Sequence, residues 1–402
     1  MRKQTYKIAL IIEKSRAYGR AICEGIAAFA HQQGNWELRL VDDMSSDKAL
    51  GQLKDVDGVI ARILSPKTLV TLRTLKVPIV DVFGGAQYSD IGLVDSDHQA
   101  VGRLAAECFL SRRFQQFAFC GYPGVHFSDL REKAFSESIE AKGFSCHRFS
   151  MALEDVRALT ARIIRQEKVD LDEHRKKLAR WLRMLPKPIS IFCCHDIRSY
   201  QLATLCKQLE IRVPQDVAIL GVDDDRILCG FSSPMLSSID PDAFEIGRQA
   251  GKLLETALES QSRYSRVSVF KKSILVSPKQ LVERASTEVY PLEPSWLSEV
   301  LIFIQRNYMR NISSDDIFKI AKLSHTIVER TFRKVLSMTV RKEIIRVRLA
   351  ESARLLQSTE LSSCKIAILV GFTNPQYFNR SFRVAYKTTP ETYRRQRKVC
   401  AN

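Results

Sequence analysis

The chain has 402 residues, more than one hydrophobic core usually organises, which predicts two or three domains. Its formal net charge is +17, and residues 295–402 hold 20 of the 62 basic residues but only 8 of the 45 acidic ones. This asymmetry indicates a basic module joined to a nearly neutral one, although a solvated helical face would give the same excess.

The cysteine pattern and the hydropathy pattern exclude several classes of protein. Ten cysteines are scattered without a Cys-x-x-Cys pair or a histidine cluster, which argues against a zinc site and fits a reducing cytosol. No apolar run is long enough to span a bilayer, and the first, Ile8–Ile12, is too short for a signal peptide. We expect a cytoplasmic protein with no membrane partner, no metal and no other cofactor.

Short apolar runs alternate with amphipathic helical stretches from residue 6 to about residue 284. The clearest strands are Lys7–Ile12, Gly58–Ile63, Pro78–Phe83, Phe117–Cys120, Ile189–Cys193 and Ala218–Val222. The clearest helices are Gly19–Gln33, Gln99–Ser111, Asp129–Lys142, Arg198–Leu209 and Phe244–Ser260. This alternation predicts an α/β fold with two doubly wound lobes of parallel strands, and a ligand site where the carboxyl ends of the strands meet.

Residues 1–286 are therefore assigned to one two-lobed domain. We place the first lobe at about 1–111 with 240–268, and the second at 112–239 with 269–286. Two prolines interrupt both periodicities in residues 287–294, which we predict to be a linker. Residues 295–402 lack a strand signal, and the helices expected there are Ser295–Arg310, Ser314–Ala321, Ser324–Leu336, Thr339–Leu356, Ser362–Val370, Asn374–Tyr386 and Pro390–Arg397.

An internal repeat lies in this helical region, because residues 324–333 align with residues 374–383 at an offset of fifty. Each copy starts with a cap-type residue, Ser324 or Asn374, and has apolar residues four and eight positions later that bury one face. A short helix and a tight turn precede each copy, as in a helix-turn-helix unit whose second helix enters the DNA major groove. A helical core without a DNA role explains one such unit, but two matched copies in a basic region favour DNA binding.

The exposed faces of the two second helices carry side chains that match base edges and phosphates. The predicted base contacts are Arg330 and Arg380 to guanine, Gln376 and Asn379 to adenine, Glu329 to cytosine and Thr326 to the methyl group of thymine. The predicted phosphate contacts are Ser324, Arg333 and Arg383.

This region resembles the AraC-type DNA-binding domain. The resemblance rests on Leu349–Leu356, Ile366, Ala367, Val370–Phe372, Tyr377, Phe378, Ser381–Arg383 and Thr389–Arg394. Three positions depart from the family, which has glycine where this chain has Lys322, Ser337 and Lys387. The first unit is therefore the weaker match.

Residues 6–287 resemble the periplasmic-binding-protein-like sensor domain of LacI-type regulators, without their N-terminal DNA-binding head. The segments that match are Ser15–Arg20, Val94–His98, Gly102–Ala106, Arg131–Phe135, Phe192–Asp196, Val213–Val217, Ile219–Asp223, Pro234–Ser238 and Glu283–Thr287. The resemblance implies Asp97, Arg131, Asp196 and Asp223 as ligand residues, and Tyr18 could stack on a sugar ring. Asp196 and Asp223 are equally typical of helix caps, and Asp97 or Asp95 could simply cap the helix at Gln99.

The pairing of these two domains resembles sugar-responsive activators of catabolic operons and implies a regulator, not an enzyme. The expected partners are double-stranded DNA, a monosaccharide effector with D-xylose first, a second copy of the chain, and RNA polymerase. A non-sugar effector, an α/β enzyme and a phosphorylated receiver remain as alternatives. The sequence lacks a phosphate-binding loop and a Gly-x-Ser-x-Gly elbow, and the acidic pair Asp42 and Asp43 follows the second strand, where a receiver would have it after the first.

Overall fold

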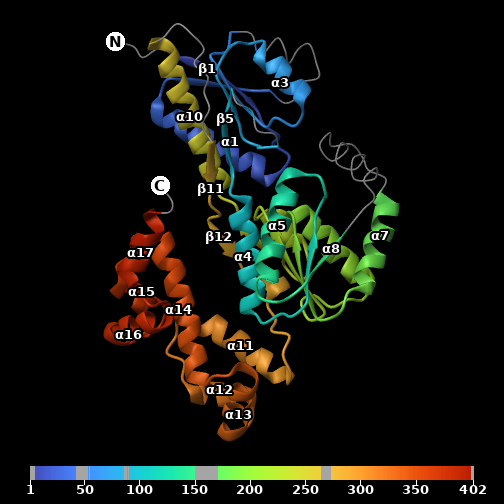
Figure 1. Cartoon of the computed structure of the whole chain (residues 1–402), viewed down its shortest axis with the longest axis vertical. Coiled ribbons are helices and arrows are strands. Elements are labelled where there is room, and N and C mark those ends of the chain that lie inside the picture. Colours follow the sequence, from blue (N-terminus) through green and yellow to red (C-terminus); the bar gives the residue numbers. More distant parts are fainter. Residues whose placement is uncertain are drawn as a thin grey trace. The chain divides into compact units, whose positions relative to one another are not determined.

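The computed structural model describes residues 5–41, 53, 55–85, 88, 90–149, 171–263 and 273–399. The chain forms two compact units, Met1–Glu288 and Val289–Asn402, which are coloured from blue to orange and from orange to red in Figure 1. Asp42 and Asp43 lie outside the described residues. Among the described helices, none is long and apolar enough to cross a membrane.

The first sheet of unit 1 has the strand order β11–β5–β4–β3–β1–β2, and its strands are parallel. The strands are β1 (Tyr6–Ile11), β2 (Trp36–Leu40), β3 (Gly58–Ala61), β4 (Ile79–Asp81), β5 (Gly92–Ser96) and β11 (Ser273–Val276). In β1, Ile8 and Leu10 belong to one core cluster and Ala9 and Ile11 to another. Because successive side chains point to opposite faces, a continuous apolar run is what a strand covered on both faces requires.

Three helices pack on this sheet: α1 (Ala17–Gln33), α3 (Pro66–Arg73) and α10 (Ala243–Arg263). Two glycines let α1 and α10 approach closely. A Cβ atom on Gly25 would lie 2.0 Å from the carbonyl oxygen of Phe244, and one on Gly247 would lie 2.1 Å from that of Ile22. Any larger residue at either position would therefore push the two helices apart.

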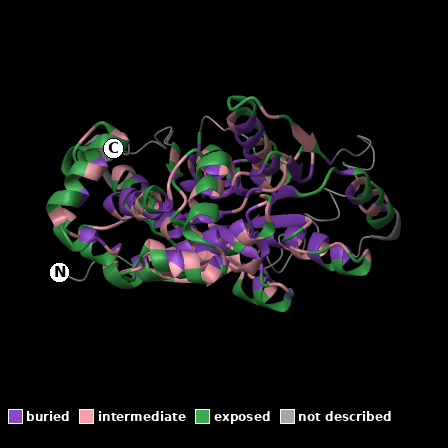
Figure 2. Cartoon of the chain, turned by 90° about the horizontal axis from the view of Figure 1, so that it is seen from below, coloured by how far each residue is buried: buried purple, intermediate pink, exposed green. Residues whose placement is uncertain are grey.

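The second sheet has the order β12–β10–β9–β8–β6–β7 and is parallel except for β12. Its strands are β6 (Phe117–Cys120), β7 (Cys146–Arg148), β8 (Ile189–Cys193), β9 (Val217–Val222), β10 (Ser237–Asp240) and β12 (Gln280–Val282). The helices of this lobe are α4 (His98–Ser111), α5 (His126–Glu140), α7 (Leu171–Met184), α8 (Asp196–Gln208) and α9 (Arg226–Phe231). Figure 2 shows the strands largely buried and the outer helix faces exposed.

Helix α4 and the late strands depart from the sequence-based division into lobes. Residues up to 111 were assigned to the first lobe, but α4 packs against α5 of the second lobe, where the rings of Phe109 and Phe135 lie 6.3 Å apart. Residues 269–286 were assigned to the second lobe, but β11 pairs with β5 in the first sheet, and only β12 pairs with β10 in the second. The chain thus passes between the sheets after Val276. β11 is an edge strand with alternating exposed residues, so its apolar pattern did not indicate which sheet it joins.

Unit 2 consists of helices that pack around two hydrophobic cores. The helices are α11 (Ser295–Asn307), α12 (Ser314–Ala321), α13 (His325–Leu336), α14 (Val340–Ser358), α15 (Ser363–Leu369), α16 (Pro375–Tyr386) and α17 (Pro390–Val399). One core is built around α11 to α14, the other around α14 to α17, and Tyr308 packs against both. Arg348 of α14 joins them, since its guanidinium donates to the carbonyls of Tyr308 (2.9 Å) and Arg310 (2.8 Å) and lies 5.9 Å from the Phe372 ring centroid.

The predicted linker, 287–294, contains residues that are buried in each of the two units. Thr287 ends a short 3₁₀ turn, Ala285–Thr287, and is fully buried in unit 1. Tyr290 is buried in the first helical core of unit 2. The predicted fold class, two parallel α/β lobes followed by a helical domain with paired helix-turn-helix units, is confirmed.

Candidate functional site

A pocket of about 450 Å³, which includes space open to solvent, lies in unit 1 where the strands of both lobes end. Its lining residues follow or end strands β1, β3, β4, β5, β6, β8 and β9, which is where ligands bind in open parallel sheets. The lining consists of Arg16, Tyr18, Arg62, Val82, Phe83, Asp95, His98, Phe127, Arg131, His195 and Asp223. Three of the five predicted ligand residues are therefore brought together here: Tyr18, Arg131 and Asp223.

Arg131 is buried in the wall of this pocket. One guanidinium nitrogen donates to the carbonyl of Cys194, and the guanidinium carbon lies 5.3 Å from the ring centroid of Phe127. Its Nε is buried and has no hydrogen-bond partner within the described part of the chain. An unpaired buried donor is costly, so the site is suited to a bound molecule that accepts from it.

Asp223 enters the pocket from the turn after β9. Burial raises its pKa from an ordinary 3.8 to about 6, against the opposing effect of Arg131 and Arg16. Its φ of 109° is in the left-handed region, which strains any residue but glycine. The carboxylate of this residue, whose backbone is strained, can accept two hydrogen bonds from a ligand.

Tyr18 forms part of the wall of the pocket. Its hydroxyl pairs with the hydroxyl of Ser96 at 3.1 Å, and burial, followed by the charge of Asp95, raises its pKa. The Arg62 guanidinium lies over the Tyr18 ring at 5.8 Å and closer to the Phe83 ring, at 5.0 Å. Phe83 and Phe127 therefore provide flat apolar surfaces, one from each lobe.

Two histidines complete the lining, and both are neutral at pH 7. Burial, followed by the charge of Arg16, lowers the pKa of His195 to about 3. Its Nδ1 accepts from the backbone N–H of Arg198 at 3.1 Å, which places the ring proton on Nε2. Burial lowers the pKa of His98, whose Nε2 lies 3.3 Å from the Asp95 carboxylate without hydrogen-bond geometry.

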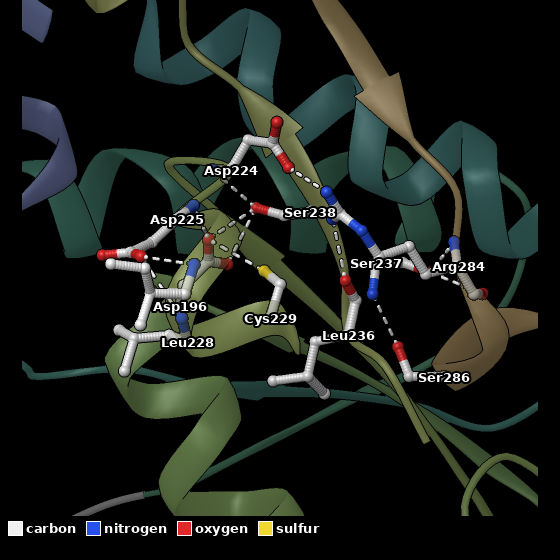
Figure 3. A network of polar contacts seen from close by, with 11 residues as sticks. Asp196, Asp224, Asp225, Leu228, Cys229, Leu236, Ser237, Ser238, Arg284 and Ser286 are labelled. Carbon is white, nitrogen blue, oxygen red and sulfur yellow. Dashed lines mark hydrogen bonds and ion pairs between the residues drawn. The ribbon is translucent and has the colours of Figure 1, made fainter. Parts of the chain in front are cut away.

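The other two predicted ligand residues, Asp97 and Asp196, are not among the lining residues. Asp97 is the N-cap of α4 and accepts from the N–H of Ala100 at 2.8 Å, as the capping alternative predicted. Asp196 is 1% exposed and lies within a polar network that Figure 3 shows. Its neighbour His195 takes the place in the pocket, because His195 precedes α8 and Asp196 already belongs to it.

Sequence reasoning missed several lining residues. Asp95 and His195 lie one or two positions before the aspartates that were chosen, and a rule that counts from the strand end would have found them. Arg16 lies in the matching segment Ser15–Arg20 but was not predicted to bind the ligand. Arg62 lies inside the predicted strand Gly58–Ile63, whereas in the structure β3 ends one residue before it. Within the described residues, no three His, Cys, Asp or Glu side chains are grouped to hold a metal ion.

In unit 2, α13 and α16 are the second helices of two helix-turn-helix units. Their apolar anchors, Val328 and Phe332 in α13 and Phe378 and Phe382 in α16, are fully buried. The predicted contact residues that are exposed are Ser324, Thr326, Arg330, Arg333, Gln376, Asn379, Arg380 and Arg383. Glu329 is half-buried, and its Oε2 has no hydrogen-bond partner within the described part of the chain.

The three positions that lack the family's glycine adopt the backbone conformation that glycine favours. Lys322, Ser337 and Lys387 have φ angles of 52°, 57° and 58°, and they end α12, α13 and α16. Each of these helices therefore ends at a residue with a left-handed backbone conformation, and none of the three residues is glycine, which adopts that conformation most easily.

Three known protein families match successive parts of the chain. These are the "XylR N-terminal domain" over residues 7–97, the "Periplasmic binding protein-like domain" over residues 106–287 and a "Helix-turn-helix domain" over residues 317–396. The matches fall on the first lobe, on the second lobe with the late strands, and on the paired helix-turn-helix units.

Relatives match over almost the whole length. The xylose operon regulatory protein of Haemophilus influenzae is 26% identical and covers 98% of this chain and 99% of its own. That of Escherichia coli K12 is 27% identical, with 97% of each chain covered. A solved structure described as the xylose-binding transcription activator xylR is 25% identical, has a TM-score of 0.60, and covers 98% of this chain and 99% of its own.

The order of the domains, the left-handed helix ends and the full-length relatives agree with one another. The chain is a DNA-binding transcription regulator that joins a periplasmic-binding-protein-like domain to an AraC-type helix-turn-helix domain and is homologous to the xylose operon regulatory proteins.

Proposed function

We propose that unit 1 binds a neutral monosaccharide in the pocket at the strand ends, and that this effector controls how the helix-turn-helix domain occupies its operator. The observation that carries the proposal is that one pocket holds the buried guanidinium of Arg131, whose Nε has no partner in the described part of the chain, and the half-buried carboxylate of Asp223. Vicinal hydroxyls of a sugar can accept from a guanidinium and donate to a carboxylate at the same time.

The remaining lining supports the same class of ligand. Phe83 and Phe127 offer faces for the C–H groups of a sugar ring. Arg16 and Arg62 are both paired with the carboxylate of Glu13, at 3.4 and 3.5 Å. With Arg131, Asp95 and Asp223 of the lining, three arginines are matched by three carboxylates, so the formal charges cancel. The pocket therefore does not demand an anion. D-xylose is the first candidate because the full-length relatives are named for it.

The two second helices would read the operator. Base contacts would come from Arg330, Glu329 and Thr326 in α13 and from Arg380, Gln376 and Asn379 in α16. Phosphates would be held by Ser324, Arg333 and Arg383, which are exposed near the ends of the same helices.

Action as a homodimer at tandem half-sites fits an exposed apolar surface on α9 and the loop after it. Ile227, Phe231 and Met235 are 58%, 73% and 52% exposed, and apolar residues exposed together on one surface are typical of interaction sites. As an activator, the DNA-bound protein would in turn contact RNA polymerase. Sedimentation of a Phe231→Ser variant tests the dimer, because that substitution should weaken self-association.

A thermal-shift screen of monosaccharides tests the effector, since a ligand that binds the folded state raises its stability by mass action. D-xylose should raise the melting temperature of the wild type, and the Arg131→Ala, Asp223→Ala double variant should lose both the shift and the calorimetric binding. Asp97→Ser keeps the cap of α4 and serves as the control that retains affinity.

Two outcomes would contradict different parts of the proposal. Undiminished affinity in the double variant would reject the pocket assignment. The absence of a shift with every pentose and hexose would reject a sugar effector.

A further inference from the structure

The turn after β9 contains two successive strained residues. Asp223 and Asp224 have φ angles of 109° and 46°, both in the left-handed region. Such residues persist only where surrounding contacts hold them, and they are common where strain serves a function. The carboxylate of Asp223 reaches the pocket, so the contacts that hold this turn also set the position of a pocket residue.

Three successive backbone N–H groups of this turn are held by β10 and Asp196. Asp223 donates to the carbonyl of Ile239 (2.9 Å), Asp224 to the hydroxyl of Ser238 (3.0 Å) and Asp225 to the carboxylate of Asp196 (2.8 Å). The Ser238 hydroxyl in turn donates to both oxygens of Asp196, at 2.8 and 3.0 Å. Figure 3 shows Asp196 at the centre of these contacts, facing the turn.

The neighbouring residue on β10, Ser237, holds a different segment. Its hydroxyl accepts from the N–H of Arg284 (2.8 Å) and donates to the carbonyl of Arg284 (2.9 Å). Its own N–H donates to the hydroxyl of Ser286 at 2.8 Å, and its hydroxyl pairs with that of Thr287 at 2.7 Å. Residues 284–287 are the last part of unit 1, from which the chain continues into unit 2.

An ion pair connects the turn directly to this last segment. The Arg284 guanidinium lies 2.6 Å from the carboxylate of Asp224 and also donates to the carbonyl of Leu236 at 2.9 Å. The two paired side chains are only 16% and 14% exposed. The hydroxyl-bearing residues between them, Ser237, Ser238, Ser286 and Thr287, are fully buried.

We propose that Asp196, Ser238, Asp224 and Arg284 couple the pocket to residues 284–287, and that Asp196 is a positioning residue for the Asp223 turn. The inference rests on the proposed function, because Asp223 is the pocket end of the coupling. An effector that engages Asp223 shifts the turn, the turn moves the Asp224 carboxylate, and Arg284 carries the movement to the segment that leads into the DNA-binding domain. Ser238 holds the turn after β9, and Ser237 holds residues 284–287. Because these two serines are adjacent in β10, neither segment shifts alone.

The test compares operator binding by the full-length protein with and without D-xylose, on a duplex selected from random sequence. In the wild type D-xylose should change operator affinity by about 5-fold or more, the usual lower range of such coupling. In Asp224→Asn and Arg284→Gln that ratio should fall to about 2-fold or less, while the affinity for D-xylose stays within about 3-fold. Arg73→Gln breaks an Arg–Asp pair of the same 2.6 Å distance, with Asp90 in the first lobe, whose side chains are more exposed (46% and 39%), and it should leave the ratio unchanged.

A second measurement needs no effector. In the unliganded full-length protein, Asp196→Asn should speed hydrogen exchange at the Arg284 and Ser286 amides, although Asp196 contacts neither residue. Exchange that changes only at residues 225 and 238 would overturn the coupling, as would an unaltered ratio in Asp224→Asn. A wild type that responds to no monosaccharide would overturn the proposed effector, and the exchange result would then still decide the coupling.

Discussion

Burial disfavours the charged form of the Asp223 carboxylate, whereas its proposed role as an acceptor for a ligand uses that charged form. The pKa of Asp223 is raised to about 6 from an ordinary 3.8, so between about pH 4 and pH 6 the folded protein holds a proton there that the unfolded chain has lost. The stability connected with this proton is complete below about pH 4 and is lost as the pH rises through about 6. At neutral pH the ionised group is therefore retained at a cost in stability, as expected for a ligand residue.

Asp223→Asn should remove that cost. We expect the variant to be more stable than the wild type by about 1–3 kcal/mol at pH 7.5 and equal to it near pH 4, with weaker effector binding. Thermal or urea unfolding across this pH range measures the difference. Asp90→Asn is the control with the opposite sign: Arg73 lowers the pKa of Asp90, so that variant should lose stability at neutral pH. A pH-independent difference for Asp223→Asn would contradict the assignment.

The two predicted types of DNA contact should differ in a measurable way. Arg380→Ala should cost about 1–3 kcal/mol on the preferred operator and relax the preference at one base pair. Arg333→Ala should weaken binding to all sequences alike and reduce the salt dependence by about one phosphate. Equal, sequence-independent losses from both variants, measured by titration at several salt concentrations, would refute the base-reading role of Arg380.

At this scale the sequence predicted the site only in part. Arg131 and Asp223 were found because the resemblance matched their segments to ligand-binding segments of the family, but Asp97 and Asp196 were chosen over Asp95 and His195. The residues that follow a strand and the cap of the next helix are neighbours in the chain. Whether such a residue lines the pocket or caps the helix depends on the residue at which the helix begins. Sequence patterns locate that point to within one or two residues.

Among the elements, the helix ends of unit 2 offer a direct test of backbone strain. Glycine at position 322, 337 or 387 should stabilise the DNA-binding domain by about 1 kcal/mol each, because left-handed conformations cost a residue with a Cβ atom about that much. Denaturant unfolding of the full-length protein measures the gain in the transition of this domain. Lys334→Gly, within α13, is the matched control and should destabilise by about 1 kcal/mol. A loss of stability in all three glycine variants would contradict the interpretation.

The elements with long periodic patterns were predicted well. The helices of unit 2 begin and end within about three residues of the prediction, because each has an apolar stripe and a cap signal. Six of the described strands were not among those predicted. The edge strands β2, β7, β11 and β12 are short and partly exposed, and polar residues interrupt the apolar pattern of β5 and β10.

For the whole molecule, coupling between effector and DNA must be reciprocal. If the effector changes operator affinity by some factor, the operator must change effector affinity by the same factor. Calorimetric titration of D-xylose into the protein with and without saturating operator should give that factor within error. Unequal factors would show that the two ligands do not bind one linked set of states, for instance because the oligomeric state changes between the titrations.

The order of the elements along the chain has a consequence for synthesis. Both sheets of unit 1 are completed by late strands, β11 and β12, and α10, which packs on α1, also follows residue 240. A nascent chain emerging from the ribosome therefore cannot finish the first lobe until residue 276 is made, or the second until residue 282. Domains generally fold in the order of synthesis. The two helical cores that follow draw on residues from 290 onward. A chain that ends early therefore lacks the helices that read DNA. Any chain long enough to bind an operator also contains the pocket that controls this binding.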